Sequence, residues 1–162
     1  MSEDHKDALK EKHLEFAKST NNRVWELLEK QDRTPKDDED MLLASFSPLY
    51  HWKHAGSAVH TQRGCWMISR AYLALDRAEQ SKEWALKCLE VTENNPGEMA
   101  EFDLAYAQEG LARVYALIGD YTLAQQHYDL ALELGDQIKD PEDQKIFRDD
   151  LNGWDWNEFS PK

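Results

Sequence analysis

Two segments of the chain carry arginines and aromatic residues at the spacing of a single helix face. Their side chains recur every three or four residues, and the two sets are Arg63, Trp66 and Arg70, then Asp103, Tyr106, Glu109 and Arg113. Guanidinium groups bind carboxylates through paired hydrogen bonds, and aromatic faces accept flat or apolar groups. Two roles follow for these residues: a surface that binds a ligand, or ion pairs that hold neighbouring helices together.

A second concentration of polar and aromatic residues is the run Tyr50-His51-Trp52-Lys53-His54. His51 and His54 are three residues apart, which permits two metal ligands on one helical turn. However, the sequence has no Glu-x-x-His, no HExxH and no cysteine-rich zinc pattern. We therefore predict that no metal is bound, that Trp52 belongs to the core, and that the histidines are polar neighbours of a helix end.

Catalytic motifs are missing from the chain. It has no GxSxG elbow, no phosphate-binding P-loop and no dinucleotide glycine fingerprint. The two cysteines, Cys65 and Cys88, fall where a helical core takes small side chains, so we expect both to be reduced and buried. The acidic run 37–40 lacks the spacing and the glycine of a calcium loop. The sequence thus favours a protein that is not an enzyme and that uses no cofactor.

Seven helices are expected to position these residues, because apolar side chains recur at helical spacing and no segment alternates with period two. The first helix carries an apolar stripe that begins with Leu9 and Phe16. Thr34 suits the start of the second, and Pro48 should kink or split that helix, with Ser47 as a new cap. The predicted ranges are 5–31, 35–54, 57–75, 78–93, 98–118, 121–138 and 141–151.

Residues 68–91 and 111–134 repeat each other at an offset of 43 residues. A repeat of this length marks a supersecondary unit that buries its apolar face by stacking on a copy of itself. The corresponding pairs include Ile68/Leu111, Arg70/Arg113, Tyr72/Tyr115, Ser81/Ala124 and Cys88/Ala131.

The repeated segments resemble the tetratricopeptide repeat family. In the second copy the resemblance lies in Leu111-Ala112, Tyr115, Gly119-Asp120-Tyr121, Ala124, Tyr128 and Ala131-Leu132. The first copy has Asp76-Arg77 in place of the Gly-Asp turn and Ala85 in place of a large aromatic residue. The wider pattern, with YHW, RGCW, SRAYLAL and FDLAYA, is similar to a group of small bacterial repeat proteins of unassigned function. The resemblance implies an all-α fold in which antiparallel helical hairpins stack as a short right-handed superhelix.

The same resemblance implies a single helical-repeat domain over residues 1–162, built from about three hairpins and a capping helix. Its parts would be a degenerate hairpin at 5–54, repeats at 57–93 and 98–138, a capping helix at 141–151 and a tail at 152–162. We expect the capping helix to turn three side chains to the core, Ile146, Phe147 and Leu151. We also expect the aromatic residues of the tail to dock on the bundle, namely Trp154, Trp156 and Phe159.

In this family the first helix of each hairpin lines a concave groove. The resemblance therefore implies that both sets of arginines and aromatics face such a groove, with His51 at its rim beside Arg63. Our first interpretation is a non-catalytic module that binds a protein or peptide there. The alternative is a sensor or enzyme for a small anionic ligand, with a pocket built around His51, Arg63, Arg70, Asp103 and Arg113.

Composition limits the partners. Its 32 acidic and 19 basic residues give the 162-residue chain a net charge of −13, which repels nucleic acids and anionic membranes. The first residues, MSEDHKDALKEK, form no signal peptide, and no window reaches the roughly 20 apolar residues of a membrane span. We expect a cytoplasmic protein that binds neither nucleic acid nor membrane. Because stacked repeats leave apolar ends, a homodimer is an alternative to a monomer.

Overall fold

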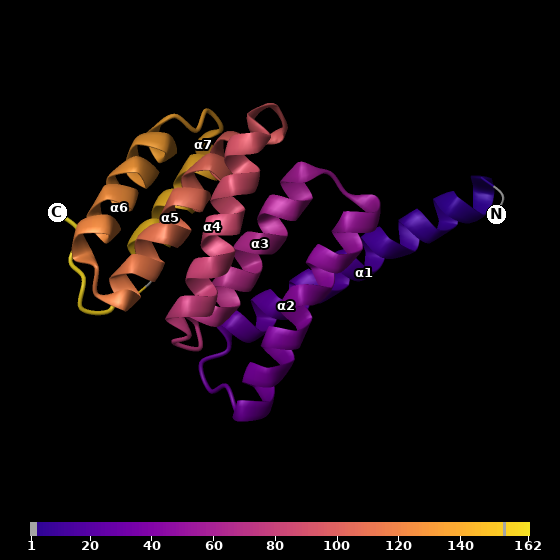
Figure 1. Cartoon of the computed structure of the whole chain (residues 1–162), viewed down its shortest axis with the longest axis horizontal. Coiled ribbons are helices and arrows are strands. Elements are labelled where there is room, and N and C mark those ends of the chain that lie inside the picture. Colours follow the sequence, from indigo (N-terminus) through magenta and orange to yellow (C-terminus); the bar gives the residue numbers. More distant parts are fainter. Residues whose placement is uncertain (1–2, 154) are drawn as a thin grey trace.

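Helices form almost the whole structure. The computed structural model describes residues 3–153 and 155–162, and this part contains seven α-helices, a short 3-10 turn and no strand (Figure 1). The helices are α1 (Glu3–Glu29), α2 (Pro35–Ala55), α3 (Ala58–Leu73), α4 (Ala78–Asn94), α5 (Glu101–Ile118), α6 (Tyr121–Asp136) and α7 (Pro141–Gly153). The all-α prediction is confirmed.

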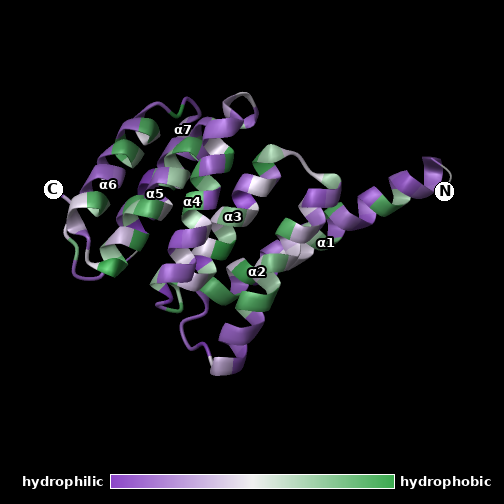
Figure 2. Ribbon diagram, viewed as in Figure 1, coloured by the Kyte–Doolittle hydropathy of each residue, from purple (hydrophilic) through white to green (hydrophobic). Residues whose placement is uncertain are grey.

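Consecutive helices pack as hairpins that stack on one another. α1 packs on α2, α3 on α4 and α5 on α6, and the hairpins meet through contacts of α2 with α3 and of α5 with both α3 and α4. Figure 1 shows this succession from indigo to orange, with α7 beside α5 and α6. Each helix carries both apolar and polar residues (Figure 2), as expected for helices with one buried face. The predicted stack of helical hairpins is therefore present.

The two repeats turn in the same way between their helices. Gly119, after α5, has a left-handed backbone with φ of 87°, and Asp76, at the corresponding place after α3, has φ of 55°. Glycine adopts this conformation without strain, and aspartate is one of the few other residues that tolerate it. The hydrogen bonds that follow are also the same, with backbone N–H to carbonyl distances of 3.0 Å for Arg77 to Tyr72 and for Asp120 to Tyr115.

Small side chains lie where the two helices of each repeat meet. Ser69 of α3 and Ser81 of α4 are buried, and each hydroxyl donates to the backbone carbonyl of the other at 2.9 Å. In the second repeat, Ala112 and Ala124 occupy the corresponding positions and are fully buried. Side chains at a crossing set how closely two helices approach, and both hairpins bury small residues at these corresponding positions.

Helix α2 begins as predicted but is not divided. The Thr34 hydroxyl accepts from the N–H of Asp37, whose carboxylate accepts from the N–H of Thr34 at 2.8 Å, which is a capping box. Pro48 is buried within α2, yet the helix continues from Pro35 to Ala55, so the predicted split at Ser47 is wrong. Proline removes one backbone donor, and α2 nevertheless stays one helix, packed on both α1 and α3.

Helix α1 extends beyond its partner. Ala17, Val24 and Leu28 are buried, whereas Leu9 and Phe16 are 44% and 55% exposed. Figure 1 shows the N-terminal part of α1 projecting past the end of α2. The predicted apolar stripe is therefore buried only along its C-terminal half, and Phe16, although it stacks on His51 of α2, stays exposed.

Helix α7 closes the C-terminal end of the stack. Phe147 and Leu151 are buried as predicted, but Ile146 is 50% exposed, so its predicted place in the core is wrong. Adjacent residues of a helix point about 100° apart, and the burial of Phe147 turns Ile146 to the side.

The described part of the tail docks on the bundle, as predicted. Trp156 and Phe159 pack into the apolar clusters of the α5–α6 hairpin. The indole N–H of Trp156 donates to the carbonyl of Leu151 at 3.0 Å. Trp154, the third aromatic residue of the prediction, lies outside the described residues.

Candidate functional site

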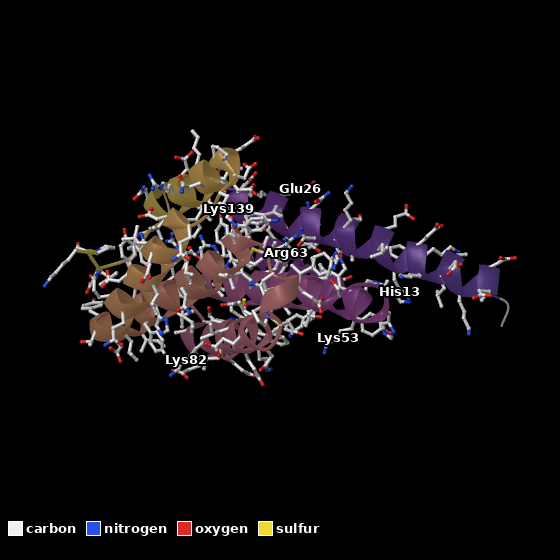
Figure 3. The ribbon with its side chains drawn as sticks, turned by 90° about the horizontal axis from the view of Figure 1, so that it is seen from above. His13, Glu26, Lys53, Arg63, Lys82 and Lys139 are labelled. Atoms are coloured by element: carbon white, nitrogen blue, oxygen red, sulfur yellow. The ribbon has the colours of Figure 1, made fainter. Side chains whose placement is uncertain are left out.

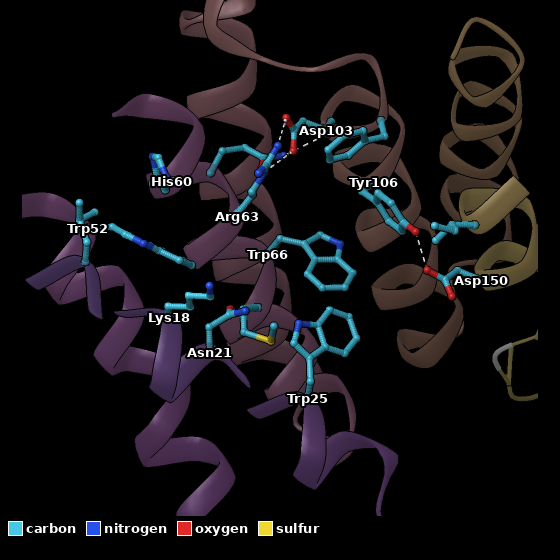
Figure 4. Close-up of a pocket in the computed structure, with 15 residues that line it drawn as sticks. Lys18, Asn21, Trp25, Trp52, His60, Arg63, Trp66, Asp103, Tyr106 and Asp150 are labelled. Atoms are coloured by element: carbon cyan, nitrogen blue, oxygen red, sulfur yellow. Dashed lines mark hydrogen bonds and ion pairs between the residues drawn. The ribbon is translucent and has the colours of Figure 1, made fainter. Parts of the chain in front are cut away.

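A cleft of about 590 Å³ opens along the odd-numbered helices, with α3 and α5 between α1 and α7 (Figure 4). Its volume falls in the range of sites that take a small molecule or part of a peptide. The lining residues are Leu14, Lys18, Asn21 and Trp25 from α1, Trp52 from α2, His60, Gln62, Arg63, Trp66 and Met67 from α3, Phe102, Asp103 and Tyr106 from α5, and Ile146 and Asp150 from α7.

One aromatic ring from each odd-numbered helix contributes to a row across this cleft. The ring centres are 5.7 Å apart for Trp25 and Trp66, 5.5 Å for Trp66 and Tyr106, and 5.0 Å for Tyr106 and Phe147. The rings meet tilted or edge to face, which are favourable arrangements. Phe147 is fully buried, whereas the other three are half-buried. This aromatic row therefore joins four helices and leaves ring surface open to the cleft.

Arg63 and Asp103 form the ion pair of the cleft. Nε and Nη2 of Arg63 donate to the two carboxylate oxygens of Asp103 at 2.8 and 3.1 Å. Asp103 is buried and also accepts from the N–H of Ala100 at 2.9 Å, whereas the side chain of Arg63 is 44% exposed. The guanidinium lies 5.0 Å from the ring centre of Phe102. Asp103 thus fixes Arg63 in place while part of the cation still faces the cleft.

Lys18 supplies a second positive charge. It lines the cleft from α1, is exposed, and makes no hydrogen bond or ion pair with the described residues. Lys18 and Asn21 lie across the cleft from Arg63 in Figure 4.

Tyr106 and Asp150 lie at the opposite end of the cleft (Figure 4). The Tyr106 hydroxyl donates to the Asp150 carboxylate. Burial raises the pKa of Tyr106, and the hydrogen bond to Asp150 raises it further, so the phenol stays protonated at neutral pH. This contact links α5 to α7 and uses one oxygen of Asp150.

Arg70, Glu109 and Arg113 lie outside the cleft lining and form a buried network. Their exposed fractions are 5%, 1% and 2%. Glu109 Oε1 accepts from Nε of Arg113 and lies 3.8 Å from Nη1 of Arg70. Burial lowers the pKa of Arg70 to about 10 against the opposing effect of Glu109, so Arg70 is charged at neutral pH.

Arg113 extends this network to α7 and the tail. It donates to the carbonyls of Asp150 and Asp155 at 3.0 and 3.3 Å, and its guanidinium lies 4.0 Å from the ring centre of Trp156. Arg70, Glu109 and Arg113 therefore tie α3, α5, α7 and the tail together, which is the ion-pair role that the sequence offered for them.

His51 lies between α1 and α2, away from the cleft lining. Its Nδ1 is 2.8 Å from Nδ1 of His13, and the ring of His13 stacks on that of His54 with centres 4.9 Å apart. Figure 3 shows His13 toward the free end of α1, with Arg63 nearer the middle of the molecule. Within residues 3–153 and 155–162, no group of three His, Cys, Asp or Glu side chains is arranged to hold a metal ion.

Trp52 and His60 occupy the place near Arg63 that was predicted for His51. Both line the cleft, and their ring centres are 5.6 Å apart. Nδ1 of His60 accepts from the N–H of Ser57 at 3.2 Å at the start of α3. Trp52 was predicted in the core and is half-buried at the cleft wall instead.

The two cysteines take no part in the cleft. Cys65 and Cys88 are free and buried, as predicted. Burial raises the pKa of Cys65 to about 11 and raises that of Cys88 as well, so neither thiol is a reactive thiolate at neutral pH.

The structure thus brings together Arg63, Trp66, Asp103 and Tyr106 from the predicted set. The sequence analysis missed the other lining residues, among them four of α1 that recur every three or four residues along one helix face: Leu14, Lys18, Asn21 and Trp25. The signal that finds them is the rule that the first helix of each hairpin lines the groove, applied to the degenerate hairpin as well.

Comparison with known proteins identifies one repeat. Residues 62–95, which cover most of α3 and α4, match the tetratricopeptide repeat. Searches of curated proteins and of solved structures gave no match. Together with the stacked hairpins, the match shows a tetratricopeptide-like helical repeat protein, a class that generally serves in protein interactions. None of the helices in the described ranges is long and apolar enough to cross a bilayer.

Proposed function

We propose that this protein is a non-catalytic helical-repeat module that binds a peptide or protein partner in the cleft between α1, α3, α5 and α7. The observation that carries the proposal is the aromatic row. Trp25, Trp66 and Tyr106 are only half-buried and line the same cavity. Large aromatic side chains at the centre of an interface contribute most of its binding energy, and an apolar concave surface is a typical place for them.

The polar residues around the row suit a partner segment that is held in one orientation. Arg63 is fixed by Asp103, and Tyr106 by Asp150. Side chains already held in place lose little conformational entropy when a partner binds, so their hydrogen bonds contribute more to affinity.

A photo-crosslinking experiment tests the proposal. A benzophenone amino acid in place of Ile146, which is 50% exposed in the cleft, should capture a partner from a native lysate. The matched control is the same substitution at Leu130 of α6, which is 43% exposed and outside the cleft. The partner captured at Ile146 should be lost when Trp66 is replaced by Ala. Equal capture at both positions, or capture that survives Trp66→Ala, would rule out the cleft as the binding site.

A sensor or enzyme for a small anionic ligand is the second candidate, favoured by the size of the cleft and by Arg63 at its edge. Of the residues predicted for this pocket, Arg63 and Asp103 line the cleft, whereas His51, Arg70 and Arg113 do not. A thermal-shift screen with anionic metabolites tests it, because a ligand that binds only the folded state raises the melting temperature by mass action. No shift with any metabolite would count against this candidate.

A further inference from the structure

We propose that the ligand of the cleft carries one acidic group beside a flat apolar group, and that Lys18 and Arg63 bind the acid. This inference rests on the proposed use of the cleft for binding and specifies the chemistry of what enters it.

The cleft has more hydrogen-bond donors than it satisfies. Lys18 has no partner among the described residues, and Nη1 of Arg63 has none, because Asp103 takes Nε and Nη2. The indole N–H groups of Trp25 and Trp66 donate to no described residue either, unlike that of Trp156. Buried indole N–H groups usually have an acceptor, and both of these rings are partly buried. A ligand that supplies acceptor oxygens matches this surplus.

The two carboxylates of the cleft, Asp103 and Asp150, already accept hydrogen bonds, and neither forms an ion pair with Lys18. Asp103 already accepts three hydrogen bonds, two from Arg63 and one from Ala100. Asp150 lies at the Tyr106 end and accepts from that hydroxyl (Figure 4). The charge of Lys18 therefore stays uncompensated at the other end.

This distribution orients the ligand. Its acid lies between Lys18 and Arg63, where charge-assisted hydrogen bonds form, and away from Asp150. Its flat group extends over Trp66 toward Tyr106, along the aromatic row. In this orientation the flat group of the ligand contacts the aromatic rings, and its acid contacts the hydrogen-bond donors of Lys18 and Arg63.

The net charge of the chain limits the ligand to a single acid. A total of −13 repels polyanions at a distance. Interactions between exposed charges are screened beyond about 8–10 Å in physiological salt, so an acid in contact with Lys18 responds mainly to the local cations. A monoanion with an aromatic body fits both conditions, whereas a nucleic acid or polyphosphate does not.

Isothermal titration calorimetry on the full chain tests the inference. The probes are 2-naphthylacetate with its neutral amide, and the peptide Ac-Phe-Glu-NH2 with its neutral partner Ac-Phe-Gln-NH2. At least one acid should bind about tenfold more tightly than its neutral partner, the factor that corresponds to about 1.4 kcal/mol. The acid's advantage should shrink as salt is added.

Variants locate the acid. Lys18→Gln should remove the preference, and Lys18→Arg should keep it because the charge remains. The matched control is Lys12→Gln on the same helix, since Lys12 is exposed and does not line the cleft. That variant changes the net charge by the same amount and should keep the preference.

The outcomes separate this inference from the proposed function. Equal affinity for acid and amide, a preference that persists in Lys18→Gln, or no binding of either acid at millimolar concentration would overturn the inference. In those cases, capture of a partner through Ile146 would still support a peptide site of different chemistry. If naphthylacetate binds and the peptide does not, the acid is a free aromatic metabolite, and the result counts against a peptide partner. The reverse result assigns the acid to a peptide side chain.

Discussion

Glu109 shows at the scale of single residues how the buried charges act. Its carboxylate is 1% exposed and faces Arg70 and Arg113, and its Oε2 has no hydrogen-bond partner among the described residues. A buried carboxylate costs several kcal/mol of desolvation unless cations compensate for it. The two arginines that repeat at the 43-residue offset therefore share Glu109 as a buried counter-charge.

Replacement of either arginine tests this role. Arg113→Ala leaves Glu109 buried with one cation fewer, and Arg70→Ala does the same from α3. We expect each to lower the free energy of unfolding by about 3–5 kcal/mol in chemical denaturation without ligand. Arg23→Ala, which breaks an exposed pair with Asp40, should have little effect. Unchanged or increased stability in both buried variants would instead support an anion site at these residues.

The turn residue Asp76 is a second position at which one side chain affects the stability of the fold. Its left-handed backbone, with φ of 55°, strains an L-amino acid but not glycine. Asp76→Gly should raise the free energy of unfolding by about 0.5–1 kcal/mol, since the relief of strain exceeds the greater flexibility of glycine in the unfolded chain. Gly119→Asp, the reciprocal change in the other repeat, should destabilise. Thermal denaturation of the pair measures both effects, and a loss of stability in Asp76→Gly would contradict the argument.

At the scale of the helices, two glycines differ in how much space surrounds them. Gly64 lies at a close approach of two helices, and Gly110 does not. A Cβ on Gly64 of α3 would lie 3.0 Å from Cβ and 3.2 Å from Cα of Leu49 in α2. A Cβ on Gly110 of α5 would lie 3.6 Å from the nearest atom of Trp66, which is a normal contact. Gly64 is therefore required by the approach of α2 to α3, and Gly110 is not required by its neighbours.

Alanine at these two positions should have opposite effects. Gly110→Ala gains helix propensity and should stabilise by about 0.5–1 kcal/mol. Gly64→Ala gains the same propensity but pushes α2 and α3 apart, and overpacking of about 1–3 kcal/mol should make it destabilising overall. Urea denaturation of the two variants gives the comparison. If both substitutions stabilise, the close packing of α2 on α3 is not rigid.

The α1–α2 hairpin should be sensitive to acid. Burial lowers the pKa of His51 from its ordinary value of 6.5, and His13 and His54 lower it further. His51 then binds a proton more readily in the unfolded chain than in the folded chain. The contribution of neutral His51 to the free energy of unfolding is therefore present above pH 6.5 and is lost as the pH falls below it. Melting temperatures between pH 7.5 and 5 should fall less in His51→Gln than in the wild type. His5→Gln, at the exposed start of α1, should follow the wild type. Equal acid sensitivity in all three proteins would show that His51 does not cause the loss.

At the scale of the whole molecule, the two ends of the stack differ in how far other segments cover them. At the C-terminal end, α7 and the tail cover α5 and α6, and Trp156 packs on Arg113 and Tyr128. At the N-terminal end, half of α1 projects and leaves Leu9 and Phe16 exposed. In the described residues, the C-terminal end of the stack is covered, whereas part of α1 projects at the other end.

The tail should therefore behave as part of the folded unit. Trp156→Ala removes a half-buried ring that contacts Tyr128 and Phe159, and we expect a loss of about 2–3 kcal/mol in the free energy of unfolding. Glu158→Ala, an exposed change in the same segment, is the control. Chemical denaturation measures both variants. Wild-type stability in Trp156→Ala would mean that the docked tail contributes nothing.

The oligomeric state, the single domain and the cytoplasmic location stay predictions from the sequence. Light scattering after size exclusion decides the first, because a mass of 18.9 kDa at high micromolar concentration would exclude a homodimer.

Local signals in the sequence determined the helices and their ends. Thr34 caps the second helix at the predicted place, and Gly119 ends α5 in the left-handed conformation. The 43-residue correspondence predicted a repeated hairpin, and the structure shows matching turns and small buried residues at the corresponding positions. These features depend on residues near one another in the chain, so periodicity and residue type are enough to find them.

Only the tertiary structure decided which helix faces meet. Spacing placed Arg63 and Arg70 along one helix face, yet Arg63 lines the cleft and Arg70 is buried beside Glu109. Spacing likewise placed both Ile146 and Phe147 in the core, although only Phe147 is buried, and it did not predict that Lys18 would line the cleft. A helix face a hundred degrees wide can be covered or left open, depending on how neighbouring helices cross it. Those crossings depend on contacts between residues far apart in the chain, which sequence periodicity does not record.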